Sequence, residues 1–77
     1  MNARRRKDLE KAIELLEQAR EIIEYALNDE QEAYDNLPEG IQDSERGDRM
    51  YQAIDSLEDA ESGFDDIIDS INEAIEA

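Results

Sequence analysis

Apolar residues recur along most of this chain with the seven-residue period of packed α-helices. In the first half, large apolar residues occupy heptad position a and alanine occupies position d: Leu9, Leu16 and Ile23, then Ala12, Ala19, Ala26 and Ala33. The second half repeats the pattern, with Met50, Leu57, Phe64 and Ile71 at position a and Ala53, Ala60, Ile67 and Ala74 at position d. Each series continues for about four heptads, which favours helix over strand. The pattern therefore predicts two long helices.

A short segment with helix-breaking residues separates the two periodic stretches. Pro38 disfavours helical geometry in the residue before it, and Gly40 readily adopts a positive φ. We therefore expect helices over residues 3–35 and 44–76, joined by a linker over residues 36–43. Helices of similar length joined by a short linker predict an all-α fold, a single antiparallel two-helix hairpin that covers the whole chain.

One feature of the second helix argues for a break. Ser62-Gly63, with Asp65 three residues after the serine, resembles a helix N-cap and could begin a third helix. The heptad phase passes through Gly63 without a slip. We therefore expect one continuous helix.

The apolar surface of both helices is wider than a two-helix seam requires. Apolar side chains also occupy positions e and g, beside the seam: Ile13, Leu15, Ile22, Leu27, Ile54, Ile68 and Ile75. A hairpin of this size has little core, and an exposed apolar flank is unfavourable in a monomer. We expect these residues to form the interface of a homodimer, a four-helix bundle. The alternative is a monomeric hairpin that offers the flank to a different protein.

Charge is the most unusual property of the composition. The 77 residues include 23 Asp and Glu against 8 Lys and Arg, which gives a net charge of −15. No basic residue occurs after Arg49. The carboxylates of the second helix that we expect to form a partner-binding face are Asp55, Glu58, Asp59, Asp65, Asp66, Asp69, Glu73 and Glu76. The alternative is that these carboxylates only keep the protein in solution.

The density of this charge is comparable with that of nucleic acid. Fifteen charges along a helix pair of about 50 Å correspond to about one per 3.3 Å, and a side-by-side dimer to about one per 1.7 Å. Duplex DNA carries a similar axial density. This predicts a partner that binds DNA or RNA, and no direct binding of nucleic acid by the chain itself.

The basic residues gather at the N-terminus, in Arg4-Arg5-Arg6-Lys7. Antiparallel packing brings residues 4–11 near residues 69–76, so we expect these cations to pair with the acidic end of the second helix. We expect the rings of Tyr25 and Tyr51 to project into solvent.

The composition narrows the chemistry. The absence of Cys and His excludes disulfides, thiolate and histidine catalysis, and Cys/His zinc sites. Acid pairs three residues apart are frequent, but 23 acids produce them by chance, and hard cations need converging carboxylates. We expect no enzyme activity, no cofactor and no metal. No apolar run approaches the roughly 20 residues of a membrane span, so we expect a soluble cytoplasmic protein.

The central segment carries a resemblance to a known group. Tyr34-Asp35-Asn36-Leu37-Pro38-Glu39-Gly40-Ile41-Gln42, followed by Ser44-Glu45-Arg46-Gly47, resembles the centre of small acidic helical proteins encoded by phages and prophages of Firmicutes. That group has no settled activity. The resemblance implies a phage accessory protein acting in the host cytoplasm. By analogy with small acidic phage proteins that imitate DNA, it implies an inhibitor of host defence.

Overall fold

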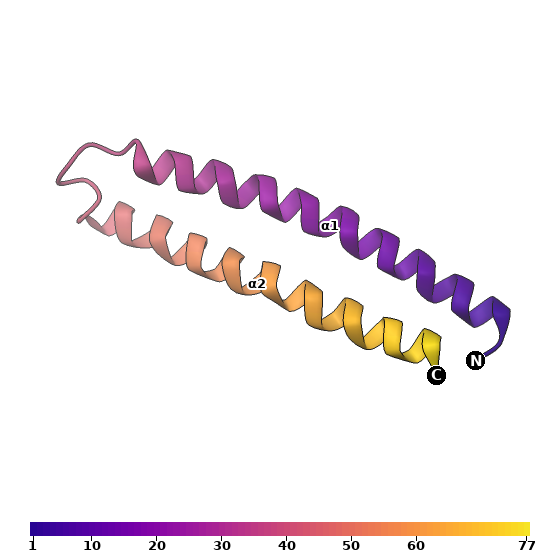
Figure 1. The fold of residues 1–77 in the computed structure, drawn as a ribbon. Coiled ribbons are helices and arrows are strands. Elements are labelled where there is room, and N and C mark those ends of the chain that lie inside the picture. The colour runs from indigo at the N-terminus through magenta and orange to yellow at the C-terminus, as the bar shows by residue number, and fades with distance from the viewer.

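The computed structural model describes all 77 residues and contains two helices. Helix α1 spans Ala3–Asp35 and helix α2 spans Glu45–Glu76. They run antiparallel, side by side, with both chain termini at the same end (Figure 1). The molecule is a rod with extents of 58 × 15 × 12 Å. The predicted all-α antiparallel hairpin is confirmed, and both helices begin and end within one residue of the positions expected from the sequence.

Polar side chains cap the start of each helix. The Asn2 side chain accepts a hydrogen bond from the backbone N–H of Arg5 at 2.9 Å. The Ser44 hydroxyl accepts one from the backbone N–H of Gly47 at 3.4 Å. The first N–H groups of a helix have no partner within it, so such caps stabilise the helix ends.

The loop between the helices folds back against the first turn of α2. Its Gln42 side-chain amide donates a hydrogen bond of 3.1 Å to the backbone carbonyl of Tyr34, near the end of α1. Gly40 has a φ of 75°, a conformation that glycine adopts most easily. Gly47 is buried, because the backbone of Ile41 and Gln42 lies where a Cβ atom would be. The loop therefore needs a glycine at position 47.

Helix α2 continues through Ser62 and Gly63, as expected. The Ser62 hydroxyl donates a hydrogen bond of 3.0 Å back to the carbonyl of Asp59 in the preceding turn. Because that hydroxyl bonds backwards within the helix, it does not cap a new one.

The two helices pack through heptad positions a and e. Both buried hydrophobic side chains, Ile54 and Ile68, occupy position e and are 5% and 9% exposed. The half-buried apolar residues of the seam also lie at a and e: Leu9, Ile13, Leu16, Ile23, Leu27, Met50, Leu57, Phe64, Ile71 and Ile75. Position d is divided, with Ala26, Ala33, Ala60 and Ile67 exposed and Ala12, Ala19, Ala53 and Ala74 half-buried. Position e carries isoleucine and leucine where position d carries mostly alanine, so this rotation buries more apolar surface.

Contacts across the seam define the register of the hairpin. Arg20 of α1 forms an ion pair of 2.7 Å with Asp65 of α2. The rings of Tyr34 and Tyr51 lie 6.2 Å apart, centroid to centroid. The step from Arg20 to Tyr34 along α1 is as long as the step from Asp65 back to Tyr51 along α2. The two contacts therefore belong to one register, in which each residue of α1 lies opposite one residue of α2.

This register corrects the expectation for the basic cluster. It sets Asp8 opposite Ala77, so residues 4–7 extend past the end of α2, as Figure 1 shows. The ion pairs of the structure are Lys11–Glu14, Arg20–Asp65 and Arg49–Glu45. The prediction that residues 4–7 pair with the acidic end of α2 is therefore wrong, because the hairpin is staggered by more than one helical turn.

Replacement of glycine by alanine at two positions, one against the loop and one in the open part of α2, tests the packing of the loop. We expect Gly47→Ala to lower the free energy of unfolding by about 1–3 kcal/mol, because the new Cβ collides with the loop backbone. We expect Gly63→Ala to raise it by about 0.5–1 kcal/mol, because a Cβ there meets no atom and alanine favours helix. Urea unfolding followed by circular dichroism measures both. Equal effects of the two substitutions would contradict this description of the loop.

Candidate functional site

The seam divides the exposed surface of the hairpin into two broad faces. In an antiparallel pair joined through positions a and e, positions b and f of both helices share one face, and positions d and g share the other. The contacts agree with this geometry, since the Arg20–Asp65 and Tyr34–Tyr51 pairs each join position e of α1 to position b of α2. The two faces differ sharply in charge.

The face formed by positions b and f, here called the acidic face, carries exposed carboxylates from both helices. They include Glu10, Glu14, Glu17, Glu21, Glu24 and Asp35 of α1 and Asp55, Glu58, Asp65, Asp69 and Glu76 of α2. From Glu10 to Glu24 neighbours are three or four residues apart, so their Cβ atoms lie about 5–6 Å from one another. On α2 the same spacing holds within the pairs Asp55/Glu58 and Asp65/Asp69, and Ser62 and Asn72 interrupt the series. Arg20, half-buried at the edge of the seam, is the basic side chain that pairs with this face from the opposite helix.

The structure divides the acidic residues predicted on α2 between two places. Asp55, Glu58, Asp65, Asp69 and Glu76 lie on the acidic face. Asp59, Asp66 and Glu73 occupy position c, on the outer edge of α2. The sequence interpretation omitted the glutamates of α1, although their spacing at positions b and f already contained the signal.

The opposite face, formed by positions d and g, carries no charged residue between Ala12 and Ala26 of α1 or between Ala53 and Ala74 of α2, and this stretch is here called the uncharged face. Beyond it, Asp8 and Asp29 of α1 and Arg46 and Arg49 of α2 occupy d or g positions. Its large side chains are Leu15, Ile22 and Ile67, which are 52%, 69% and 50% exposed. In the observed register, Ile67 lies across from the interval between Leu15 and Ile22, so the three side chains lie on the same stretch of this face and are here called the apolar cluster. Small residues surround this cluster: Ala12, Ala19 and Ala26 of α1 and Ala60, Gly63, Ser70 and Ala74 of α2.

This arrangement changes the set of residues available to a second copy. The structure places Ile13, Leu27, Ile54, Ile68 and Ile75 in the seam between α1 and α2 of one chain. They were expected on an open flank, because the heptad was read with its seam at a and d. Only Leu15 and Ile22 of the seven expected interface residues are exposed, and Ile67 joins them.

Glu61, at position e, is half-buried at the seam, as Glu30 is at position a. Its surroundings raise its pKa above the ordinary value of 4.5, first because burial penalises the charged carboxylate. A hydrogen bond with Glu24 of α1 and the negative charges of Glu24 and Asp65 raise the pKa further, and Arg20 opposes them. Glu61 therefore binds a proton more readily than a glutamate in open solvent does.

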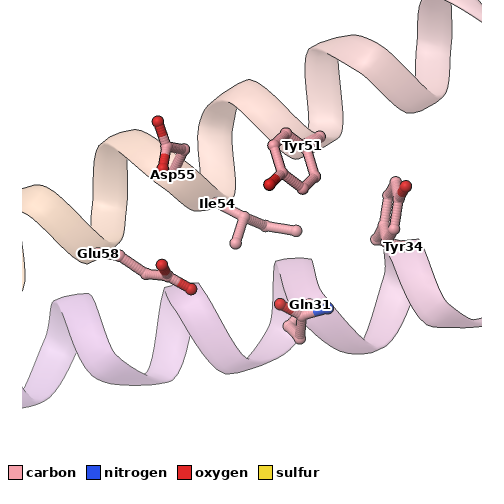
Figure 2. A pocket seen from close by; sticks show the side chains of 6 residues that line it. All are labelled: Gln31, Tyr34, Tyr51, Ile54, Asp55 and Glu58. Atoms are coloured by element: carbon pink, nitrogen blue, oxygen red, sulfur yellow. The ribbon is translucent and has the colours of Figure 1, made fainter.

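A small pocket opens on the acidic face towards the loop end of the hairpin. Its volume is about 100 Å³, and its lining residues are Gln31, Tyr34, Tyr51, Ile54, Asp55 and Glu58. Figure 2 shows Tyr34 and Tyr51 at one end, reaching in from different helices, and Glu58 at the other. Ile54 points between the helices and forms the apolar floor. Tyr51 was expected to project into solvent alone. It is exposed, as Tyr25 is, but it also contacts Tyr34, with ring planes inclined at 58°.

Other classes of site find no support in the structure. No group of three or more potential ligands among His, Cys, Asp and Glu lies close enough to hold a metal ion. Neither helix has an apolar stretch long enough to cross a membrane. No protein family, curated protein or solved structure matches this chain. The two faces and the pocket are therefore the features of the structure that bear on function.

Replacement of Glu61 tests whether the pKa of its carboxyl is raised in the folded protein. A group whose pKa is raised in the folded state favours folding below its unfolded pKa, and this contribution is lost as the pH rises through the folded pKa. We therefore expect Glu61→Gln to raise the thermal midpoint at pH 7 and to have little effect below pH 4.5. Asp69→Asn removes one charge from an exposed position of the acidic face, and it should raise the thermal midpoint less than Glu61→Gln does. An equal gain from Asp69→Asn at pH 7 would contradict the special status of Glu61.

Proposed function

We propose that this chain is a non-catalytic interaction module whose acidic face occupies the nucleic-acid-binding groove of another protein. The observation that carries the proposal is the contribution of both helices to one carboxylate surface. A single acidic helix presents one row of charge. The hairpin presents two parallel rows, as a duplex presents two rows of phosphates.

The magnitude of the charge supports this proposal. Fifteen net charges along 58 Å correspond to about one per 3.9 Å, and two hairpins side by side to about one per 1.9 Å. Duplex DNA carries about one charge per 1.7 Å of its axis. A protein groove that attracts DNA by its positive potential therefore attracts a surface of this kind.

The uncharged face supports a second part of the proposal, a homodimer in the form of a four-helix bundle. Leu15, Ile22 and Ile67 form an apolar cluster among residues small enough to let another helix approach closely. Packing of the two uncharged faces against each other directs both acidic faces outwards, away from each other. This arrangement covers the exposed cluster and keeps the like charges apart.

The setting implied by the central segment fits the same function. A phage accessory protein that blocks a DNA- or RNA-binding defence protein of the host needs only surface shape and charge, which this hairpin offers. The proposal therefore retains a host-cell role and a protein partner. The competing interpretation, a structural oligomer with a solubilising coat, differs in the role of the carboxylates.

Competition with DNA tests the acidic face. We expect the immobilised protein to capture nucleic-acid-binding proteins from bacterial lysate at low salt and to release them when duplex DNA is added. Capture should weaken steeply with salt, since screening reduces the attraction between opposite charges. We expect neutralisation of Glu17, Glu21, Asp55 and Asp69 to Gln or Asn to abolish it.

The matched control neutralises Glu32, Asp59, Asp66 and Glu73, the same number of acids on the outer edges of the helices. This control should retain most of the binding. Equal losses in both variants would show that net charge alone acts, and captured proteins that DNA does not displace would contradict the proposed function.

Leu15→Glu together with Ile22→Glu tests the dimer. We expect the unsubstituted chain to sediment at about 18 kDa, twice the 8.9 kDa of one chain, and the variant to sediment as a monomer. Each side chain covered in a dimer contributes roughly 1.5–3 kcal/mol in every copy. Tyr25→Glu, which adds charge at an exposed residue outside the cluster, should remain dimeric. Added salt should strengthen self-association, because it screens the repulsion between two negatively charged chains, while it weakens partner binding. An unsubstituted chain that stays monomeric at high salt would refute the four-helix bundle.

A further inference from the structure

We propose that the pocket lined by Tyr34, Tyr51 and Glu58 binds an arginine side chain of a partner protein. The inference rests on the proposed function in one respect only, which is that the partner approaches the acidic face. The pocket gives that face a specific point of recognition, where the rest of it offers a diffuse negative potential.

The lining of the pocket matches the parts of an arginine side chain. The faces of two tyrosine rings attract a planar cation placed within about 6 Å of a ring centroid. The rings lie 6.2 Å apart and are inclined at 58°, so one cation beside them is close to both. Asp55 and Glu58 provide carboxylate oxygens for the guanidinium N–H groups. The floor formed by Ile54 provides apolar contact for the methylene groups.

Gln31 completes the lining with an acceptor. Its side-chain nitrogen donates a hydrogen bond of 3.1 Å to the Asp35 carboxylate, one turn further along α1. The amide oxygen remains free to accept a hydrogen bond, which suits a guanidinium, a group that only donates. Because the amide nitrogen is engaged, the Gln31 side chain is held in this orientation.

The size of the pocket limits the class of ligand. A volume of about 100 Å³ is well below the roughly 300–1,000 Å³ of pockets that hold cofactors and drug-sized molecules. It accommodates the end of one side chain. A nucleotide would not fit.

No cation of the hairpin itself occupies this place. None of the residues that line the pocket is basic. Lys11 pairs with Glu14, Arg20 with Asp65 and Arg49 with Glu45. Arg46 occupies position d, on the opposite face of the hairpin. Residues 4–7 lie at the opposite end of the rod (Figure 1). The acceptors of the pocket are therefore available to a cation from outside.

The experiment uses N-acetyl-arginine N-methylamide as the probe, titrated into the full chain and followed by NMR. We expect saturable shifts of the Gln31 side-chain amide and the Ile54 methyl signals. The corresponding citrulline compound has nearly the same shape without the charge, and it should leave these signals unmoved. Equal shifts with citrulline would overturn the proposal.

Variants then distinguish binding in the pocket from attraction by the overall negative charge of the acidic face. Asp55→Asn with Glu58→Gln should raise the Kd of the probe by at least about fivefold, and Tyr51→Leu by about threefold. Asp69→Asn with Glu76→Gln removes the same charge from the acidic face outside the pocket, and it should change the Kd by less than about twofold. All three variants alter exposed residues, and circular dichroism confirms that they fold. Similar losses in the two charge-matched variants would overturn the pocket.

The outcome is independent of the test of the proposed function. Probe binding in the pocket, combined with captured proteins that DNA does not displace, would support the arginine site and reject the nucleic-acid groove. DNA-displaceable capture without probe binding would retain the groove and reject the pocket.

Discussion

The burial of isoleucine and leucine at heptad position e determines how the helices face each other. Ile54 and Ile68 are the most deeply buried side chains, and burying one contributes roughly 1.5–3 kcal/mol. A seam at positions a and d would have placed alanine where isoleucine now packs. Because the seam rotates towards e, positions d and g are left open on one side and positions b and f on the other. The two faces of the hairpin follow from this rotation.

The charge of the hairpin opposes its own folding. Each pair of like charges three or four residues apart on a helix costs about 0.2–0.5 kcal/mol, and the acidic face contains a series of such pairs on α1 and two on α2. The seam that opposes this cost has only two buried hydrophobic side chains. Solubility alone requires fewer charges than this surface carries. A dimer joined through the uncharged face would add the burial that a single hairpin lacks.

The sequence was sufficient for the elements and insufficient for their rotation. Helix boundaries could be predicted because Pro38 and Gly40 act locally. Continuity through Gly63 could be predicted because the heptad phase does not slip. Whether position d or position e joins position a in the seam could not be predicted. Both positions flank position a, and their burial depends on how the helices turn against each other. The glutamates of α1 recur at positions b and f in the sequence itself, but that they share a face with the carboxylates of α2 depends on the rotation.

The pocket was equally inaccessible to sequence reasoning. Tyr34 and Tyr51 meet only because the register sets them opposite each other, and that register depends on a loop that folds back on Gly47. A shift of one helical turn would separate the rings and would also bring residues 4–7 alongside α2. The stagger of the hairpin therefore decides both the pocket and the position of the basic cluster.

Two neighbouring residues of α2 offer the most direct test of the rotated seam. Ile68 lies in the seam and Ile67 lies on the uncharged face, and they share residue type, helix and local charge. The measurement is the urea midpoint of Ile68→Ala and Ile67→Ala by circular dichroism, at a protein concentration low enough to keep the chain monomeric. The account predicts that Ile68→Ala lowers the free energy of unfolding by about 2–5 kcal/mol and that Ile67→Ala changes it by less than about 1 kcal/mol. Equal losses, or a larger loss for Ile67→Ala, would contradict it.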